Sequence, residues 1–116
     1  MVVKEKKFVG KIINNMLTVN TPLINGWLEH ICVYTDKRIK IEIFIPNIDS
    51  NDGTLIYKSR DLEGEQRLVL REKAINEDGE VFGFSAEKYA LMEPLHVIMQ
   101  GLNDTSVMIK IRYTEE

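Results

Sequence analysis

Regular alternation of apolar and polar residues is the main pattern in this chain, and it predicts β-strands. Side chains on one face of a strand recur every second position, so a run that alternates strictly has one buried face. Segment 38–45 follows this rule, and so does segment 107–113 near the C-terminus. The apolar positions of the two segments are Ile39, Ile41, Ile43, Ile45, Val107, Ile109, Ile111 and Tyr113.

Two pairs of strands are expected from the spacing of these runs. Segment 95–99 precedes segment 107–113, and the turn-forming residues between them predict a β-hairpin. Segment 27–34 is apolar on both faces, which is typical of a central strand covered on both sides. The short link Thr35-Asp36-Lys37 joins it to segment 38–45, and this predicts that the two segments pair antiparallel.

Shorter runs complete a set of about eight strands. They cover 7–9 and 11–19 (with a bulge expected at Gly10), 54–58, 67–71 and 80–84, and turn-like pairs such as Asn25-Gly26 and Glu63-Gly64 separate them. Short strands with a turn about every ten residues are typical of a sandwich or barrel. We expect an all-β, antiparallel β-sandwich with the jelly roll as favoured topology, and at most one short helical turn near 85–91.

Composition supports this fold class and a single domain over residues 1–116. The chain has 14 Ile and 9 Val but only 3 Ala, a balance that favours strands over helices. A length of 116 residues suits one hydrophobic core, with residues 1–10 forming an N-terminal arm or an edge strand. No apolar stretch reaches the length of a membrane span, and the N-terminus lacks the apolar core of a signal peptide.

Charge is distributed unevenly along the chain. The net charge is −3, but residues 1–45 carry +3 and residues 46–116 carry −6. A nucleic-acid-binding protein normally has a clear basic excess, so we expect no nucleic-acid partner. The basic N-terminal segment is a candidate partner-binding site, formed by Lys4, Lys6, Lys7 and Phe8. The alternative is that these lysines are the solvated face of a first strand.

No catalytic or metal-binding motif is present. His30 and His96 lie within strand patterns, where a surface or structural role is expected, and the lone Cys32 alternates with apolar residues, which indicates packing. Two distant histidines and one cysteine do not fit zinc sites. The loop containing Asp49 and Asp52 resembles a calcium loop but lacks the required carboxylates at its ends. We therefore expect no enzymatic activity and no cofactor.

Aromatic residues leave one alternative open. Sugar-binding sandwiches stack aromatic rings on pyranose faces, and Trp27, Tyr34 and Tyr57 are the candidates for such a site. A single tryptophan in a small sandwich can equally be an anchor in the core or at its rim.

The order of strands and turns in the C-terminal half resembles that of the small jelly-roll structural proteins of tailed-bacteriophage virions, in particular capsid decoration or cement proteins. The features that carry this resemblance are an acidic, turn-rich segment, then Phe82-Gly83-Phe84, then 91–97, Gly101 and the closing strand 107–113.

The resemblance implies a non-enzymatic structural protein that binds a capsid lattice. Its partners would be capsid or other virion proteins and further copies of itself, with no membrane. It would be located in the virion after synthesis in the host cytoplasm. Two other classes remain as alternatives, namely a carbohydrate-binding module or lectin-like domain and an enzyme on a cupin-like frame.

Overall fold

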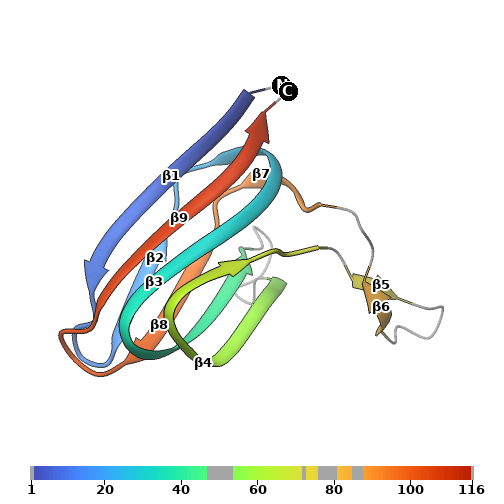
Figure 1. The fold of residues 1–116 in the computed structure, drawn as a ribbon. Coiled ribbons are helices and arrows are strands. Elements are labelled where there is room, and N and C mark those ends of the chain that lie inside the picture. Colours follow the sequence, from blue (N-terminus) through green and yellow to red (C-terminus); the bar gives the residue numbers. More distant parts are fainter. Residues whose placement is uncertain (1, 47–53, 72, 76–80, 85–87, 116) are drawn as a thin grey trace.

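The chain is all-β in a computed structural model that describes residues 2–46, 54–71, 73–75, 81–84 and 88–115. No helix occurs among these residues, and hence none long and apolar enough to cross a membrane. The nine strands are β1 (Val2–Lys11), β2 (Met16–Asn20), β3 (Ile24–Ile45), β4 (Thr54–Leu68), β5 (Lys73–Ile75), β6 (Val81–Phe84), β7 (Ala90–Glu93), β8 (His96–Gly101) and β9 (Ser106–Glu115) (Figure 1).

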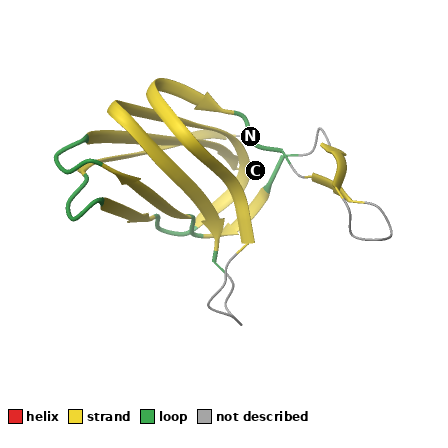
Figure 2. Ribbon diagram, turned by 90° about the horizontal axis from the view of Figure 1, so that it is seen from below, coloured by secondary structure: helices red, strands yellow, loops and turns green. Residues whose placement is uncertain are grey.

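Seven strands form one antiparallel sheet that folds over on itself into two layers (Figure 2). The first layer contains β1, β9, the first half of β3 and the end of β4, because β9 pairs with residues 27–35 of β3. The second layer contains β2, β8, the second half of β3 and the start of β4, because β8 pairs with residues 39–44 of β3. The predicted antiparallel β-sandwich is confirmed.

A single corner connects the two layers. The β3–β4 register shifts between Thr35 and Ile39, and the hydroxyl of Thr35 donates a 2.6 Å hydrogen bond to the carbonyl of Lys37 across this bend. Residues with positive φ lie where the chain bends from one layer to the other. These positions are between β1 and β2, within β4, and between β8 and β9, and the residues are Asn14, Asn15, Gly64 and Asp104. Glycine, asparagine and aspartate tolerate this conformation better than other residues, so these four residues suit the bend of the sheet.

The core lies between the two layers. In β3, β8 and β9, every second side chain points inward, which explains the alternation in the sequence. Of the predicted apolar positions, all are buried except Ile45, which is half-buried and packs against the core. The alternating residues therefore have the buried face that the sequence predicts.

The predicted pairing of these strands was partly wrong. Segments 27–34 and 38–45 do not pair with each other, because they are two halves of the continuous strand β3. Strands β8 and β9 are not a hairpin, since both pair with β3 in succession around the corner. Turn-forming residues can end a strand or bend it, and alternation alone does not distinguish the two outcomes.

Several local predictions also need correction. Asn25-Gly26 and Glu63-Gly64 lie inside β3 and β4 and form no turn between strands. The register of β1 with β9 is unbroken through Gly10, so no bulge occurs there. Of the segment predicted as a helical turn, Ala90 and Leu91 belong to β7, and residues 85–87 lie outside the described part, as does the candidate calcium loop at 49–52.

The small β5–β6 sheet lies away from the sandwich (Figure 1). The chain leaves the sandwich at Arg71 and returns at Lys88, and both residues are tied to Glu29 of β3. Arg71 donates to the carbonyl of Glu29 at 3.2 Å, and Lys88 Nζ lies 2.6 Å from Glu29 Oε1. This contact lowers the pKa of Glu29, since the ammonium of Lys88 stabilises the carboxylate.

Candidate functional site

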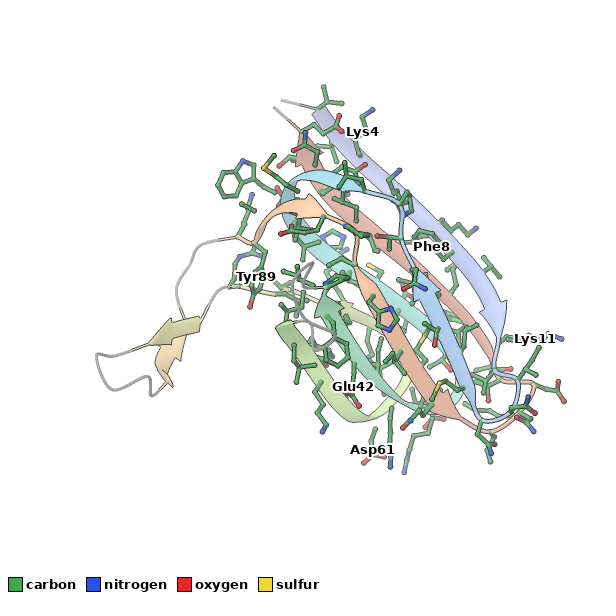
Figure 3. The ribbon with its side chains drawn as sticks, turned by 180° about the vertical axis from the view of Figure 1, so that it is seen from behind. Lys4, Phe8, Lys11, Glu42, Asp61 and Tyr89 are labelled. Atoms are coloured by element: carbon green, nitrogen blue, oxygen red, sulfur yellow. The ribbon has the colours of Figure 1, made fainter. Side chains whose placement is uncertain are left out.

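The predicted basic segment forms strand β1 at one edge of the first layer, with β9 as its neighbour. Figure 3 shows Lys4, Phe8 and Lys11 spaced along it. Alternation divides the predicted partner-binding residues between two sides. Phe8 is half-buried against the core, Lys4 and Lys6 lie on the same inward side, and Lys7 lies on the exposed side. The four predicted residues therefore do not form one surface.

Lys7 instead belongs to a row of side chains that crosses the exposed side of the first layer. The register places Lys7 opposite Lys110, Lys110 opposite Cys32, and Cys32 opposite Arg67. Adjacent strands lie about 4.8 Å apart, so three cations lie within roughly 15 Å. Like charges directly opposite one another destabilise a sheet, so the Lys7–Lys110 pair does not serve stability.

A second row lies beside the first and contributes another cation. In this row Glu5 lies opposite Arg112, and Arg112 lies opposite His30. We refer to the surface formed by Lys7, Arg67, Lys110 and Arg112 as the basic face. The three ion pairs found in the described part of the chain lie elsewhere, so these four cations are not neutralised by a carboxylate contact.

The basic face is hollowed. A shallow depression of about 330 Å³ is lined by three of these cations, Arg67, Lys110 and Arg112, and by two carboxylates, Glu5 and Glu65, together with His30 and Cys32. Partial burial lowers the pKa of His30, and the charges of Arg67 and Arg112 lower it further. The neutral form of His30 is therefore favoured, and the positive field at the surface comes from the arginines and lysines.

A larger hollow of about 440 Å³ lies at the other end of the first layer. Its lining includes Asn25, Trp27, Met92 and Glu115. Trp27 is 38% exposed, and Met92 beside it is 75% exposed. Sugar rings stack on an aromatic ring that lies beside polar side chains. This hollow is therefore the candidate site for the alternative function, carbohydrate binding.

The three aromatic residues predicted for sugar binding do not meet. Trp27 and Tyr34 lie seven residues apart along β3, which is roughly 20 Å in an extended strand. Tyr57 lies on β4 in the second layer, half-buried against the core. A sugar site on this structure would therefore use Trp27 without either tyrosine.

The remaining candidate residues are also separated. His30 lies in the first layer and His96 in the second, where His96 Nδ1 forms a hydrogen bond with Asn20 Oδ1. Cys32 lies on the exposed side of β3 and is half-buried, so the predicted cover on both sides of segment 27–34 is absent there. Within the described residues, no group of three or more potential metal ligands occurs.

Sequence reasoning missed three residues of the basic face. Arg67, Lys110 and Arg112 are far from Lys7 in the chain, and only the strand register brings them together. Alternation correctly placed Lys110 and Arg112 on the outward side of their strand. Alternation does not identify the neighbouring strand, so the cluster cannot be found from the sequence alone.

Comparison with known proteins gives a likeness of fold. The sequence matches no protein-family model and no curated protein. Among solved structures, it is similar to a chain in the "Cyanophage Pam1 capsid asymmetric unit", with a TM-score of 0.52 and 12% identity over 96% of this chain and 83% of that chain. A second match, in the structure of infectious bursal disease virus Gx strain, has a TM-score of 0.30 and 11% identity, and covers 96% of this chain and 31% of that one.

Proposed function

We propose that this protein is a non-enzymatic virion structural protein that binds neighbouring virion proteins through the basic face. Within that class, we propose a bacteriophage capsid decoration or cement protein that self-associates and that reaches the virion after synthesis in the host cytoplasm. The observation that carries the proposal is the row formed by Lys7, Lys110 and Arg67, three cations on one face that form no ion pair with the described residues.

The likeness of fold supports this class of protein. The match covers 96% of the 116 residues of this chain and 83% of the chain in the cyanophage capsid, so the two chains are of comparable size. We propose an accessory component and not the shell subunit, because a chain of 116 residues forms only one small β-sandwich.

The charge distribution indicates what the partner surface must offer. A patch with four cations and two carboxylates, Glu5 and Glu65, has an excess of positive charge and is complementary to a surface rich in aspartate and glutamate. Such complementarity chiefly fixes partner choice and association rate. The chain as a whole carries −3, which disfavours a nucleic-acid partner. We therefore propose an acidic protein surface as the partner.

A binding assay with particles of the parent virus that lack this protein tests the proposal. Lys110→Glu reverses one charge of the basic face and places a carboxylate opposite Lys7, which should leave the fold intact. We expect this variant to lose at least tenfold in affinity in co-sedimentation. Lys40→Glu, an exposed lysine of the second layer, is the matched control and should bind as the wild type does.

Three outcomes would contradict the proposal. They are the absence of this protein from purified particles, equal loss of affinity in both variants, and preferential binding of DNA or RNA over the particles at the same salt concentration. Raising the salt concentration should weaken binding of the wild type more than that of Lys110→Glu, because the variant has fewer charges to screen.

The hollow beside Trp27 supports a second candidate, a carbohydrate-binding module. Trp27 is the only tryptophan, so its fluorescence reports on this hollow alone. A sugar that stacks on the ring should shift the emission in titration, and Trp27→Ala should abolish binding on a glycan array. A wild-type protein that binds nothing on the array would count against this candidate.

A further inference from the structure

Strand β1 presents a free edge that is regular along its whole length. Among the described strands, β9 is its only ladder partner, and all ten residues from Val2 to Lys11 pair in an unbroken register. A straight edge strand leaves the backbone amide and carbonyl groups of alternate residues unpaired, and another strand can bind there. Natural proteins usually interrupt such an edge with a bulge or a proline, and β1 has neither.

The side chains on the exposed side of β1 form a self-complementary series. The residues on this side are Val3, Glu5, Lys7, Val9 and Lys11, and the first four lie symmetrically about Lys6, which points to the other side. If two copies of β1 run antiparallel with Lys6 opposite Lys6, Glu5 of each copy faces Lys7 of the other. In the same register Val3 faces Val9, and these side chains are 52% and 73% exposed in the single chain.

The registers one step away do not give this complementarity. A register centred on Phe8 places Glu5 opposite Lys11, but it aligns only residues 5–11, whereas the Lys6-centred register aligns residues 2–10. In two antiparallel strands related by a two-fold axis, residues that face each other point to the same side of the sheet. The axis can therefore move only from one residue of β1 to the next. Moving the pairing by one such step places Glu5 opposite Glu5 or Lys7 opposite Lys7. Opposite charges across a strand pair stabilise it and like charges destabilise it. The Lys6-centred register has two Glu5–Lys7 pairs against one Lys6–Lys6 pair, so it is favoured over these two registers.

From this pattern we infer that a second copy of this chain pairs antiparallel with the free edge of β1, with the two Lys6 residues meeting at the two-fold axis. The pairing joins two four-stranded first layers into one continuous sheet. Because the axis is perpendicular to the sheet, both basic faces lie on the same side of the dimer. Two copies of one binding surface on one side would increase avidity for a repeating partner.

The two Lys6 side chains are the unfavourable element of this interface. Lys6 lies on the inward side of β1, and an inward-pointing charge on an edge strand is also a known protection against pairing. The inference therefore predicts that removal of this charge strengthens the dimer. Lys6→Thr, which keeps a residue suited to strands, should lower the dissociation constant at least fivefold.

Sedimentation equilibrium of the purified protein, from micromolar to millimolar concentration, tests the pairing. Glu5→Lys alone and Lys7→Glu alone each place two like-charged pairs at the interface, and each should raise the dissociation constant at least tenfold. The double variant Glu5→Lys/Lys7→Glu restores both opposite-charge pairs and should return to within about threefold of the wild type. Rescue by the second charge reversal distinguishes pairing from a loss of folding.

A matched charge swap on the second layer serves as control. Glu42 on β3 lies opposite Lys58 on β4, so Glu42→Lys/Lys58→Glu makes the same chemical change away from β1 and should leave the dissociation constant unchanged. The inference is overturned if the wild type and Lys6→Thr are both monomeric at millimolar concentration, or if the double variant at Glu5 and Lys7 fails to restore association. No virus particle is used, so the result is independent of the proposed virion role.

Discussion

Gly26 lies where two strands approach too closely for a side chain. It belongs to β3 and pairs with Leu91 of β7, while β9 passes on the other side. A Cβ atom added at Gly26 would lie 2.2 Å from the carbonyl oxygen of Thr114 and 2.9 Å from its carbonyl carbon. Both atoms belong to the backbone, so a rotamer change cannot relieve the contact and β9 itself must move by about 1 Å.

The size of the effect follows from this displacement. Overpacking a rigid site costs about 1–3 kcal/mol, and the upper end applies because the obstacle is backbone. Displacing β9 also weakens one or two hydrogen bonds to β3, each contributing about 1 kcal/mol. We therefore expect Gly26→Ala to lower the free energy of unfolding by about 4 kcal/mol, out of a total of roughly 5–15 kcal/mol for a domain of this size.

Equilibrium unfolding in urea measures this loss. With a slope of about 2 kcal/mol per molar, the midpoint of Gly26→Ala should fall by about 2 M. Two other glycines provide graded controls. Gly64 has no atom within 4 Å of the added Cβ but has a φ of +76°, so Gly64→Ala should lose about 1–2 kcal/mol through backbone strain alone.

Gly10 completes the series. Its added Cβ would meet only the side-chain tip of Leu17, at 3.2 Å, and that side chain can rotate away. Gly10→Ala should therefore change the stability by less than about 1 kcal/mol. Loss of less than 1 kcal/mol in Gly26→Ala, or a greater loss in Gly10→Ala, would refute the reasoning that the backbone of β9 sets the limit.

Two further predictions concern charge and packing. Glu29→Gln should lose about 1 kcal/mol at pH 7, after allowance for solvent screening of the partly exposed Lys88. Because the folded-state pKa of Glu29 is lowered, this stability is present above the unfolded pKa of about 4.5 and is lost as the pH falls through the folded value. The gap between wild type and variant in urea unfolding should therefore narrow as the pH falls below about 4.5, and a gap that is constant with pH would contradict this account. Ile41 is fully buried, so Ile41→Ala should cost about 3 kcal/mol and Ile41→Val about 1 kcal/mol in the same assay, whereas equal costs would show that the site does not form a cavity.

Burial could be predicted from the sequence because it depends on local alternation. Ile41 and Ile109 each lie in a run of period two, and each is buried in the core. Strand partners depend on long-range geometry, which alternation does not contain. The turn formers around Gly64 predict a chain reversal, but in the structure they bend the continuous strand β4 where the sheet folds over.

The same distinction applies to the candidate site. Lys7 was identified because it lies in a cluster of lysines along the chain. Arg67 and Lys110 were missed because each is an ordinary outward-facing residue of its own strand. Their role as neighbours of Lys7 arises only from the order of strands in the first layer, so the basic face becomes visible only with the register.

The pairing of β1 with β9 joins the two ends of the chain, since Val2 lies opposite Glu115 and the termini lie together in Figure 1. During synthesis, β1 is made before β9 and has no ladder partner until β9 has left the ribosome. The exposed valines of β1 must not cause aggregation during that interval. The lysines of this strand oppose aggregation because like charges repel one another. The first layer is therefore completed only after β9 has been synthesised.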